Sequence, residues 1–381
     1  MSNRMKKVMM VLTFATALGL AACGRPKEGN NTASVSTVQN NNTSQSDVKQ
    51  KQEQAELTAQ TVTFTDSAGR EVEIPKQIDR IVPSGNLAQM MLVTVAPEKL
   101  VGVAKQYGEK SMAYLPETLK TLPELGTFYG KNADMNLEAV LKTEPQIIID
   151  IGEKKKTIQE DMDGLQNQLG VPVVFVEATL ENMDQAYLTL GQILGKEEET
   201  KKQAAYIRKT LDEAREKAAT ITEEQKKTVY YAEGDDGLAT NPKGSIHADV
   251  IDIVGGVNVA EVEMTSGKGG EQISMEQLLA WNPSVIISSS KAASATEMPQ
   301  DAGWEQLAAV QNGQVYTIPQ QPFNFMGRPP AVNRIIGIKW LGHTLYPNVF
   351  NYDMIREVKE FYQLFYHHSL QDEDVAKILG Q

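Results

Sequence analysis

The chain has 381 residues, of which 41% are hydrophobic and 23% charged, and its formal net charge at neutral pH is −12. This length and apolar content are enough for a sizeable core and favour two domains. The acidic balance argues against nucleic acid or anionic lipid as a general partner.

Residues 1–22 have the pattern of a lipoprotein secretion signal. Three basic residues precede the apolar run 8–20, and the segment ends in Leu-Ala-Ala before Cys23, the only cysteine of the chain. The segment is too short and wrongly flanked to span a membrane. We expect Cys23 to become the lipidated N-terminus, which would anchor the protein to the outer face of the cytoplasmic membrane, at the cell surface or in a periplasm. The alternative is an ordinary signal peptide with an incidental cysteine.

Residues 23–60 follow as the lipidated cysteine and a tether. They are rich in Asn, Ser, Thr, Gln and Lys and contain almost no large apolar residues. Such a segment cannot bury enough surface to fold, so we expect it to be disordered.

Residues 61–181 alternate between strand and helix patterns and are expected to form an N-terminal lobe. The run 62–75 alternates into a turn and out again, which predicts a hairpin. Core strands are expected at 80–84, 100–104, 147–151 and 171–176, a helix after 85–91, and a connecting helix over 152–169. This alternation predicts an α/β lobe, with a parallel sheet.

Residues 182–226 are expected to form a helical backbone between two lobes. A first helix over 182–194 ends at Gly195, and a second over 196–219 contains no Gly or Pro. The second helix has i,i+4 pairs at Glu197–Lys201 and Glu198–Lys202 and a thin apolar stripe formed by Ala204, Ile207 and Leu211. One ordinary surface helix of a single domain is the alternative.

Residues 227–381 repeat the α/β pattern as a C-terminal lobe. Strands are expected at 228–232, 285–288 and 314–318, and helices at 245–254, 304–310, 332–345 and 353–367. One motif also occurs in both lobes: NLEAVLKTEP begins at Asn136 and SMEQLLAWNP at Ser274. Without gaps, Glu138 aligns with Glu276, and both copies run through a Pro into a β-branched strand, which indicates two similar lobes.

These features together resemble a substrate-binding lipoprotein of the ABC-importer family for iron chelates, haem and cobalamin. They are the Leu-Ala-Ala-Cys lipidation motif at residues 20–23, the hairpin over 62–75, the IDRIVPS strand and the paired motif. They also include the helix over 196–219 and the C-terminal GRPPAVNRIIGIKWLGHTLYP segment. The resemblance covers residues 61 to the C-terminus. It implies an α/β fold of two Rossmann-like lobes with mostly parallel sheets, joined by a long rigid α-helix, with the ligand cleft between the lobes.

The resemblance also implies a function. The protein would be a non-enzymatic, monomeric carrier that delivers a ferric siderophore or similar iron complex to an ABC permease dimer with a cytoplasmic ATPase. Glu138 and Glu276, one on each lobe, would dock onto arginines of the permease as charge-assisted pairs. Each glutamate could instead be an ordinary acid of a first helical turn, favoured by the helix dipole.

Candidate cleft residues come from loops that follow the carboxyl ends of strands, where ligands bind in such sheets. They are Ser84, Asn86, Tyr107, Tyr129, Lys131, Thr240, Ser245, His247, Lys268, Phe325 and Arg328. Arg328 is the first choice, because it stands among aromatic residues in a composition suited to a catecholate or carboxylate chelate. Arg334, inside the following helix, is expected to be structural.

Other ligands and functions stay open at this point. The four histidines form no His-rich loop, so neither a bare metal ion, a structural metal nor a cofactor is expected. Haem or cobalamin fits the same fold, and so does a molybdate- or tungstate-type oxyanion, for which Ser84, Ser245 and Arg328 could serve. No hydrolase motif is present, and an exported hydrolase or a surface adhesin is the remaining alternative.

Overall fold

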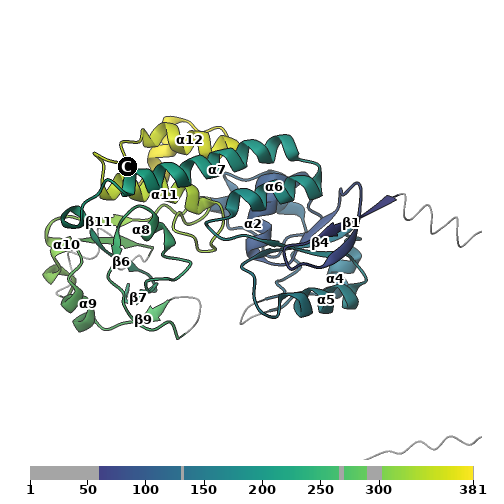
Figure 1. The fold of residues 1–381 in the computed structure, drawn as a ribbon, viewed down its shortest axis with the longest axis horizontal. Helices are drawn as coiled ribbons and strands as arrows, with labels where there is room; N and C mark the ends of the chain where they lie inside the picture. Colours follow the sequence, from purple (N-terminus) through teal and green to yellow (C-terminus); the bar gives the residue numbers. More distant parts are fainter. Residues whose placement is uncertain (1–59, 130–132, 266–269, 290–302, 381) are drawn as a thin grey trace, which may run out of the picture. The chain divides into compact units, whose positions relative to one another are not determined.

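The computed structural model describes residues 60–129, 133–265, 270–289 and 303–380, all within one compact unit that spans residues 55–381. Two separate sheets organise this unit, one of order β3-β4-β5 and one of order β11-β10-β6-β8 (Figure 1). All neighbouring strands within these two sheets are parallel. Parallel neighbours need crossover connections, which the helices supply. The expected two-lobed α/β fold is confirmed.

The first lobe is built on the three-stranded sheet. Its elements are β3 (Ile81–Pro83), α2 (Asn86–Val95), α3 (Glu109–Met112), α4 (Leu137–Lys142), β4 (Ile147–Gly152), α5 (Ile158–Leu169) and β5 (Val173–Glu177). The strand β4 is buried on both faces, because Ile147 and Ile149 belong to one apolar cluster and Ile148 to another. Such strands read as continuous β-branched runs in the sequence.

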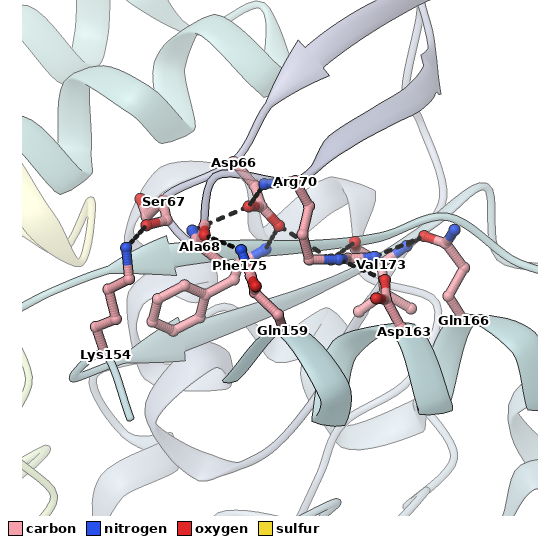
Figure 2. Close-up of polar contacts among 10 residues, drawn as sticks. All are labelled: Asp66, Ser67, Ala68, Arg70, Lys154, Gln159, Asp163, Gln166, Val173 and Phe175. Atoms are coloured by element: carbon pink, nitrogen blue, oxygen red, sulfur yellow. Dashed lines mark hydrogen bonds and ion pairs between the residues drawn. The ribbon is translucent and has the colours of Figure 1, made fainter. Parts of the chain in front are cut away.

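The expected hairpin is confirmed as β1 (Thr61–Thr65) and β2 (Glu71–Pro75), which pair antiparallel. A buried arginine fastens its turn to the lobe (Figure 2). Arg70 Nη1 donates to Asp66 Oδ2 at 3.0 Å and to the Val173 carbonyl at 2.9 Å, and its Nε donates to Asp163 at 2.7 Å. The turn is therefore held against both β5 and α5.

The same turn also contacts the segment between β4 and α5 (Figure 2). Lys154 Nζ donates to the Ser67 carbonyl at 2.9 Å, and Gln159 Nε2 donates to the Ala68 carbonyl at 2.8 Å. The Lys154 bond therefore holds the segment between β4 and α5, and the Gln159 bond holds the first turn of α5.

The expected helical backbone is formed by α6 (Met183–Leu194) and α7 (Glu197–Ala218). The helix α7 packs on α6 and also on α8, α11 and α12 of the second lobe (Figure 1). Its buried face is wider than the expected stripe and includes Gln203, whose Nε2 donates to the Thr94 carbonyl in α2 and the Leu364 carbonyl in α12. Of the residues in the two expected i,i+4 pairs, Lys201 and Glu198 form an ion pair with each other, three residues apart, at 2.9 Å.

The second lobe is built on the four-stranded sheet. Its strands are β6 (Thr228–Ala232), β7 (Ala239–Thr240), β8 (Val257–Asn258), β9 (Glu271–Gln272), β10 (Val285–Ser288) and β11 (Val315–Thr317). Its helices are α8 (Asp249–Ile253), α9 (Met275–Trp281), α10 (Ala308–Gln311), α11 (Asn333–Leu345), α12 (Met354–Phe365) and α13 (Asp372–Leu379). The short strands β7 and β9 pair antiparallel outside the main sheet. Turns of 3₁₀ helix complete the chain at Pro97–Lys99, Glu117–Thr121, Glu223–Gln225 and Trp304–Gln306.

The paired motif corresponds to matching local structure in the two lobes. The side chains of Asn136 and Ser274 cap α4 and α9 in the same way, each accepting a bond from the backbone N–H three residues later. Glu144 and Asn282, at the same offset, both have left-handed backbone, with φ of 46° and 41°. The strands β4 and β10 then begin at the same distance after these residues. The repeat is therefore structural and extends through helix, turn and strand.

Four sequence predictions of elements are wrong in extent or kind. The helix expected over 304–310 is divided, because Leu307 has extended backbone between the 3₁₀ turn Trp304–Gln306 and α10. Residues 100–104 form only isolated bridges to Ile81 and Glu124, and Gly102 packs so closely on Leu125 that a Cβ there would lie 2.2 Å from it. The helix expected over 152–169 begins only at Ile158, since Gly152 still belongs to β4. The helix expected over 245–254 is shortened to α8, because Ser245 and Ala248 form turns first.

The structure leaves the proposed domain limits as predictions. The boundaries at residues 181–182 and 226–227 fall just before α6 and just before β6. Among the described residues, no helix is both long enough and apolar enough to cross a membrane. The signal peptide, Cys23 and the tether lie outside the described residues.

Candidate functional site

A cavity of about 700 Å³ lies at the carboxyl ends of β3, β4 and β5. Its first wall comes from the segments that follow these strands, and its second wall from the residues that precede α8 and α11. Ligands of open α/β sheets bind at this edge, and the volume is typical of sites for small organic ligands. The cavity is therefore the candidate site, and it takes residues from both lobes.

The beginning of α2 forms part of the first wall. Ser84 and Gly85–Ala88 line the cavity, and Gly85 caps the helix without a side-chain bond to it. The first backbone N–H groups of a helix have no acceptor within the helix, and the helix dipole places partial positive charge there. No acidic residue occupies this first turn. This end of α2 is thus suited to a negatively charged group of a ligand.

A buried carboxylate also lies in the first wall. Asp150 in β4 is only 5% exposed and lines the cavity, and the Ser84 hydroxyl donates a hydrogen bond to its Oδ1. Burial raises the pKa of Asp150 to about 6, although the Ser84 bond and Lys155 act in the opposite direction. The buried end of the first wall at Asp150, here called the floor of the cavity, therefore holds an acid that changes its charge close to neutral pH.

Tyr129 and Lys155 form the outer part of the first wall. The Lys155 ammonium lies 3.6 Å from the centre of the Tyr129 ring, a cation–π contact. Burial, together with nearby Asp150 and Asp161, raises the pKa of Tyr129, so its hydroxyl stays protonated. Among the described residues, this buried hydroxyl has no hydrogen-bond partner.

His247 lies in the second wall. Its Nδ1 is 2.7 Å from the Gly327 carbonyl. Since a carbonyl can only accept, Nδ1 carries a proton and donates it to this bond. Burial lowers the pKa of His247, and Arg328 and Arg334 nearby act in the same direction.

Arg328 lies in the second wall, where Glu233 and Asn241 hold its guanidinium. Its Nε lies 2.7 Å and 2.9 Å from the two oxygens of Glu233, and its Nη2 donates to Asn241 Oδ1 at 3.1 Å. Glu233 and Asn241 are buried, and Asn241 Nδ2 also donates to Glu233 at 2.8 Å. The Arg328 side chain itself is 39% exposed. The guanidinium is therefore fixed in direction and still accessible from the cavity.

Arg334, expected to be structural, also lines the cavity. It is only 2% exposed and donates to the carbonyls of Ile246 and Pro330 at 3.2 Å and 3.0 Å, and to Asp249 at 3.4 Å. Burial lowers its pKa to about 10, which still leaves it charged at neutral pH. It supports the wall and adds a second cation to it.

The structure brings some of the predicted cleft residues together and leaves others apart. Those that line the cavity are Ser84, Asn86, Tyr129, His247 and Arg328. Tyr107, Thr240, Ser245 and Phe325 do not line it. Lys131 and Lys268 lie outside the described residues.

The four residues that are absent from the cavity wall have other contacts. The Tyr107 ring packs against Phe323 at 5.3 Å. Thr240 belongs to β7, which pairs with β9. The Ser245 hydroxyl accepts from the backbone N–H of His247, and Phe325 is buried in the inner core. Lying in a loop that follows a strand was therefore not enough to place these four side chains in the cavity.

Sequence reasoning missed several residues of the wall, and two of them left a signal. Asp150 interrupts the otherwise aliphatic strand IIIDIG, and Arg334 stands in a helix that is buried on nearly all sides. A charge placed where its neighbours are all buried needs a specific partner or a function. Thr127, Thr179 and Asp249 left no comparable signal.

Two further predictions concern a metal site, which was not expected, and the positions of Glu138 and Glu276. Within the described ranges, no cluster of three or more His, Cys, Asp or Glu side chains is arranged to hold a metal ion. Glu138 and Glu276 lie in the first turns of α4 and α9 and are both exposed. Neither of them lines the cavity.

The comparisons with known proteins agree with this geometry. The sequence profile of the periplasmic binding protein family matches residues 86–322. An ABC transporter solute binding protein from Sulfurospirillum deleyianum is 31% identical, with a TM-score of 0.77 over 84% of this chain and 99% of that structure.

Two further relatives have names that mention different ligands. The molybdate-binding protein MolA of Haemophilus influenzae is 25% identical over 344 residues, which cover 82% of this chain and 93% of that protein. The high-affinity heme uptake system protein IsdE of Staphylococcus aureus is 26% identical over 262 residues, covering 66% of this chain and 83% of that protein. The chain therefore belongs to the periplasmic binding protein family, as a solute-binding protein of an ABC transporter.

Proposed function

We propose that this protein binds an anionic iron complex of the ferric-siderophore type and delivers it to an ABC permease. One observation carries the proposal: two arginines line one wall of the cavity, and the uncapped beginning of α2 lines the other. Both features favour negative charge. A ligand with acidic oxygens at its periphery would be held from two sides.

The way Arg328 is held supports this choice. Glu233 and Asn241 engage Nε and Nη2, so the guanidinium loses little conformational entropy when a ligand binds to its remaining donors. A flexible lysine at the same place would have to be ordered on binding. The pair Glu233–Arg328 therefore behaves as a prepared anchor.

The size of the cavity favours a chelate over a bare oxyanion. A single water molecule occupies about 30 Å³ of liquid volume, and a tetrahedral oxyanion of five heavy atoms would fill only a small part of 700 Å³. Molybdate remains the second candidate, because MolA is a relative and because Ser84, Thr127 and Thr179 supply hydroxyl groups on one wall. It would need ordered water to fill the rest.

The test is a calorimetric titration of the purified protein with ferric catecholate, ferric hydroxamate, haem, cobalamin and molybdate. We expect saturable binding of one ferric chelate, weakened at least about 10-fold in Arg328→Gln through loss of a charge-assisted bond. Arg356→Gln, which removes an exposed charge outside this cavity, is the matched control. Saturation by molybdate alone would replace the ligand, and no binding at all would contradict the proposal.

We also propose that Glu138 and Glu276 dock the protein onto the permease. They occupy equivalent places in the two lobes, so a permease dimer could present one cationic site to each. Charge reversal by Glu138→Lys and Glu276→Lys should abolish ligand uptake in cells while ligand affinity stays unchanged. Glu160→Gln, an exposed acid on α5, serves as control. Normal uptake in the double variant would reject this assignment.

The lipid anchor is the last part of the proposal. Cys23, preceded by small residues after an apolar run, is the expected lipidation site. Mass spectrometry of the N-terminal peptide should find acylated Cys23, and Cys23→Ser should release the protein from the membrane. An unmodified Cys23 in the membrane fraction would contradict it.

A further inference from the structure

The buried carboxylate in the floor of the cavity is the feature that the proposed function leaves unexplained. Asp150 is 5% exposed, and the Ser84 hydroxyl donates to its Oδ1. Burying a carboxylate is costly unless several donors compensate it. An anion-binding site has no evident use for another anion in its floor.

The second lobe shows that the fold does not require an acid here. Because β4 and β10 begin at equivalent residues, Asp150 corresponds to Ser288 in β10. The neighbouring strands pair in the same register, Ile81 with Ile147 and Val229 with Val285. The same position of an equivalent parallel sheet is thus occupied without a carboxylate.

The groups around Asp150 do not neutralise it fully. Ser84 faces it from the end of β3, Lys155 from the segment after β4, Asp161 from α5 and Tyr129 from the loop before α4. Lys155 and the Ser84 hydroxyl favour the ionised carboxylate, but burial, with Asp161 acting in the same direction, outweighs them and raises the pKa. A hydrogen-bond donor supplied by a ligand would stabilise the ionised carboxylate of Asp150, which the surrounding protein groups do not fully do.

We propose that Asp150 selects the ligand by accepting a hydrogen bond or an ion pair from it. The solute is then an anionic complex that also carries a donor, such as a hydroxyl, an amide N–H or an ammonium group, at the end that enters the floor. This assignment rests on the proposed function, since it requires the ligand to occupy this cavity. Its anionic part faces Arg328 and Arg334, and its donor faces Asp150.

The assignment separates two classes of ligand by the sign of their pH dependence. A ligand with a donor binds best when Asp150 is ionised, so its affinity falls as the pH drops below about 6. A fully deprotonated oxyanion has only acceptors and would meet the ionised carboxylate as a like charge. Its affinity would rise as the pH drops through the same range.

The experiment compares the wild-type protein with Asp150→Asn by calorimetric titration between about pH 5 and about pH 8. The probes are a ferric tris-catecholate that carries amide N–H groups and sodium molybdate. Wild type and variant are compared at each pH, so protonation of the probe itself cancels. Glu160→Gln, which also removes one negative charge but lies outside the cavity, is the matched control.

We expect Asp150→Asn to bind the ferric complex about 10-fold or more weakly at about pH 8, with the difference vanishing near pH 5. Ser84→Ala, which keeps the carboxylate and removes one donor, should retain the pH dependence. Equal affinities of wild type and Asp150→Asn at every pH, with Arg328→Gln still impaired, would overturn this inference and leave the proposed function intact. The inference would also be overturned if only molybdate bound, without the ferric complex, and Asp150→Asn bound it more tightly than wild type. Absence of binding by the wild type to either probe would contradict the proposed function and this assignment together.

Discussion

At the scale of single residues, Arg70 shows how a buried ion pair fastens a turn. Its partner Asp66 is fully buried at the side chain, whereas Asp163 is 58% exposed. We expect Arg70→Met to lower the free energy of unfolding by about 3–5 kcal/mol, because it leaves Asp66 buried without its cation. Asp163→Asn should change it by less than about 1 kcal/mol. Urea denaturation measures both, and equal effects of the two substitutions would contradict this account.

Asp150 should impose a pH-dependent cost on stability. Its pKa rises from 3.8 to about 6 on folding, so the folded protein binds the proton more tightly than the unfolded chain does. Stability is therefore lost as the pH rises through this interval. We expect Asp150→Asn, which keeps an oxygen for the Ser84 hydroxyl, to be more stable than wild type by roughly 1–3 kcal/mol at about pH 8. Below about pH 4 the two proteins should unfold alike, and a constant difference at all pH values would count against the interpretation.

Residues of the cavity were only partly predictable. Ser84 and Asn86 could be found because they follow a β-branched strand, and sequence position fixes that edge of a parallel sheet. The sequence marks Arg334 as a charge in a buried helix, but its place in the cavity wall depends on how α11 lies against the segment before α8. Tyr107 and Phe325 follow suitable segments too, yet both pack against other aromatic or apolar groups.

At the scale of elements, the paired helix–turn–strand units contain one unfavourable backbone conformation. Glu144 is exposed and has φ of 46°, a left-handed value that costs about 1–2 kcal/mol for most residues. We expect Glu144→Gly to raise the free energy of unfolding by about 0.5–1 kcal/mol, after the entropy cost of glycine. Glu144→Gln, which cannot relieve the strain, is the control. A loss of stability in Glu144→Gly would show that the turn is not strained.

The extent of each element was predictable where the signal was local. The strands β6 and β10 were expected at the observed residues, because buried β-branched runs between turn residues leave little choice. The helix α7 was expected from helix propensity, i,i+4 charge pairs and a thin apolar stripe, all of which are local signals. The failures at residues 100–104 and 152–157 have one physical cause. There, contacts with distant segments, Leu125 at Gly102 and the hairpin turn at Lys154, decide the backbone.

At the scale of the whole molecule, the two lobes share one apolar core. A single cluster of buried residues contains Ile147 of the first sheet and Val285 of the second, and it continues through α6, α7, α11 and α12. Separate clusters cover only the outer face of each sheet. Lobes that share their core should not unfold independently.

We therefore expect one calorimetric unfolding transition for both lobes, with equal calorimetric and van't Hoff enthalpies. Leu211→Ala, in the buried face of α7, should shift the entire transition downward, because removing a buried leucine costs about 2–5 kcal/mol. Ile355→Ala, at a side chain that is 40% exposed on α12, should leave it nearly unchanged. If two transitions were resolved and Leu211→Ala moved only one of them, the lobes would be separate folding units. The helix α7 would then be a connector between them, and the ligand cavity could open without unfolding any shared core.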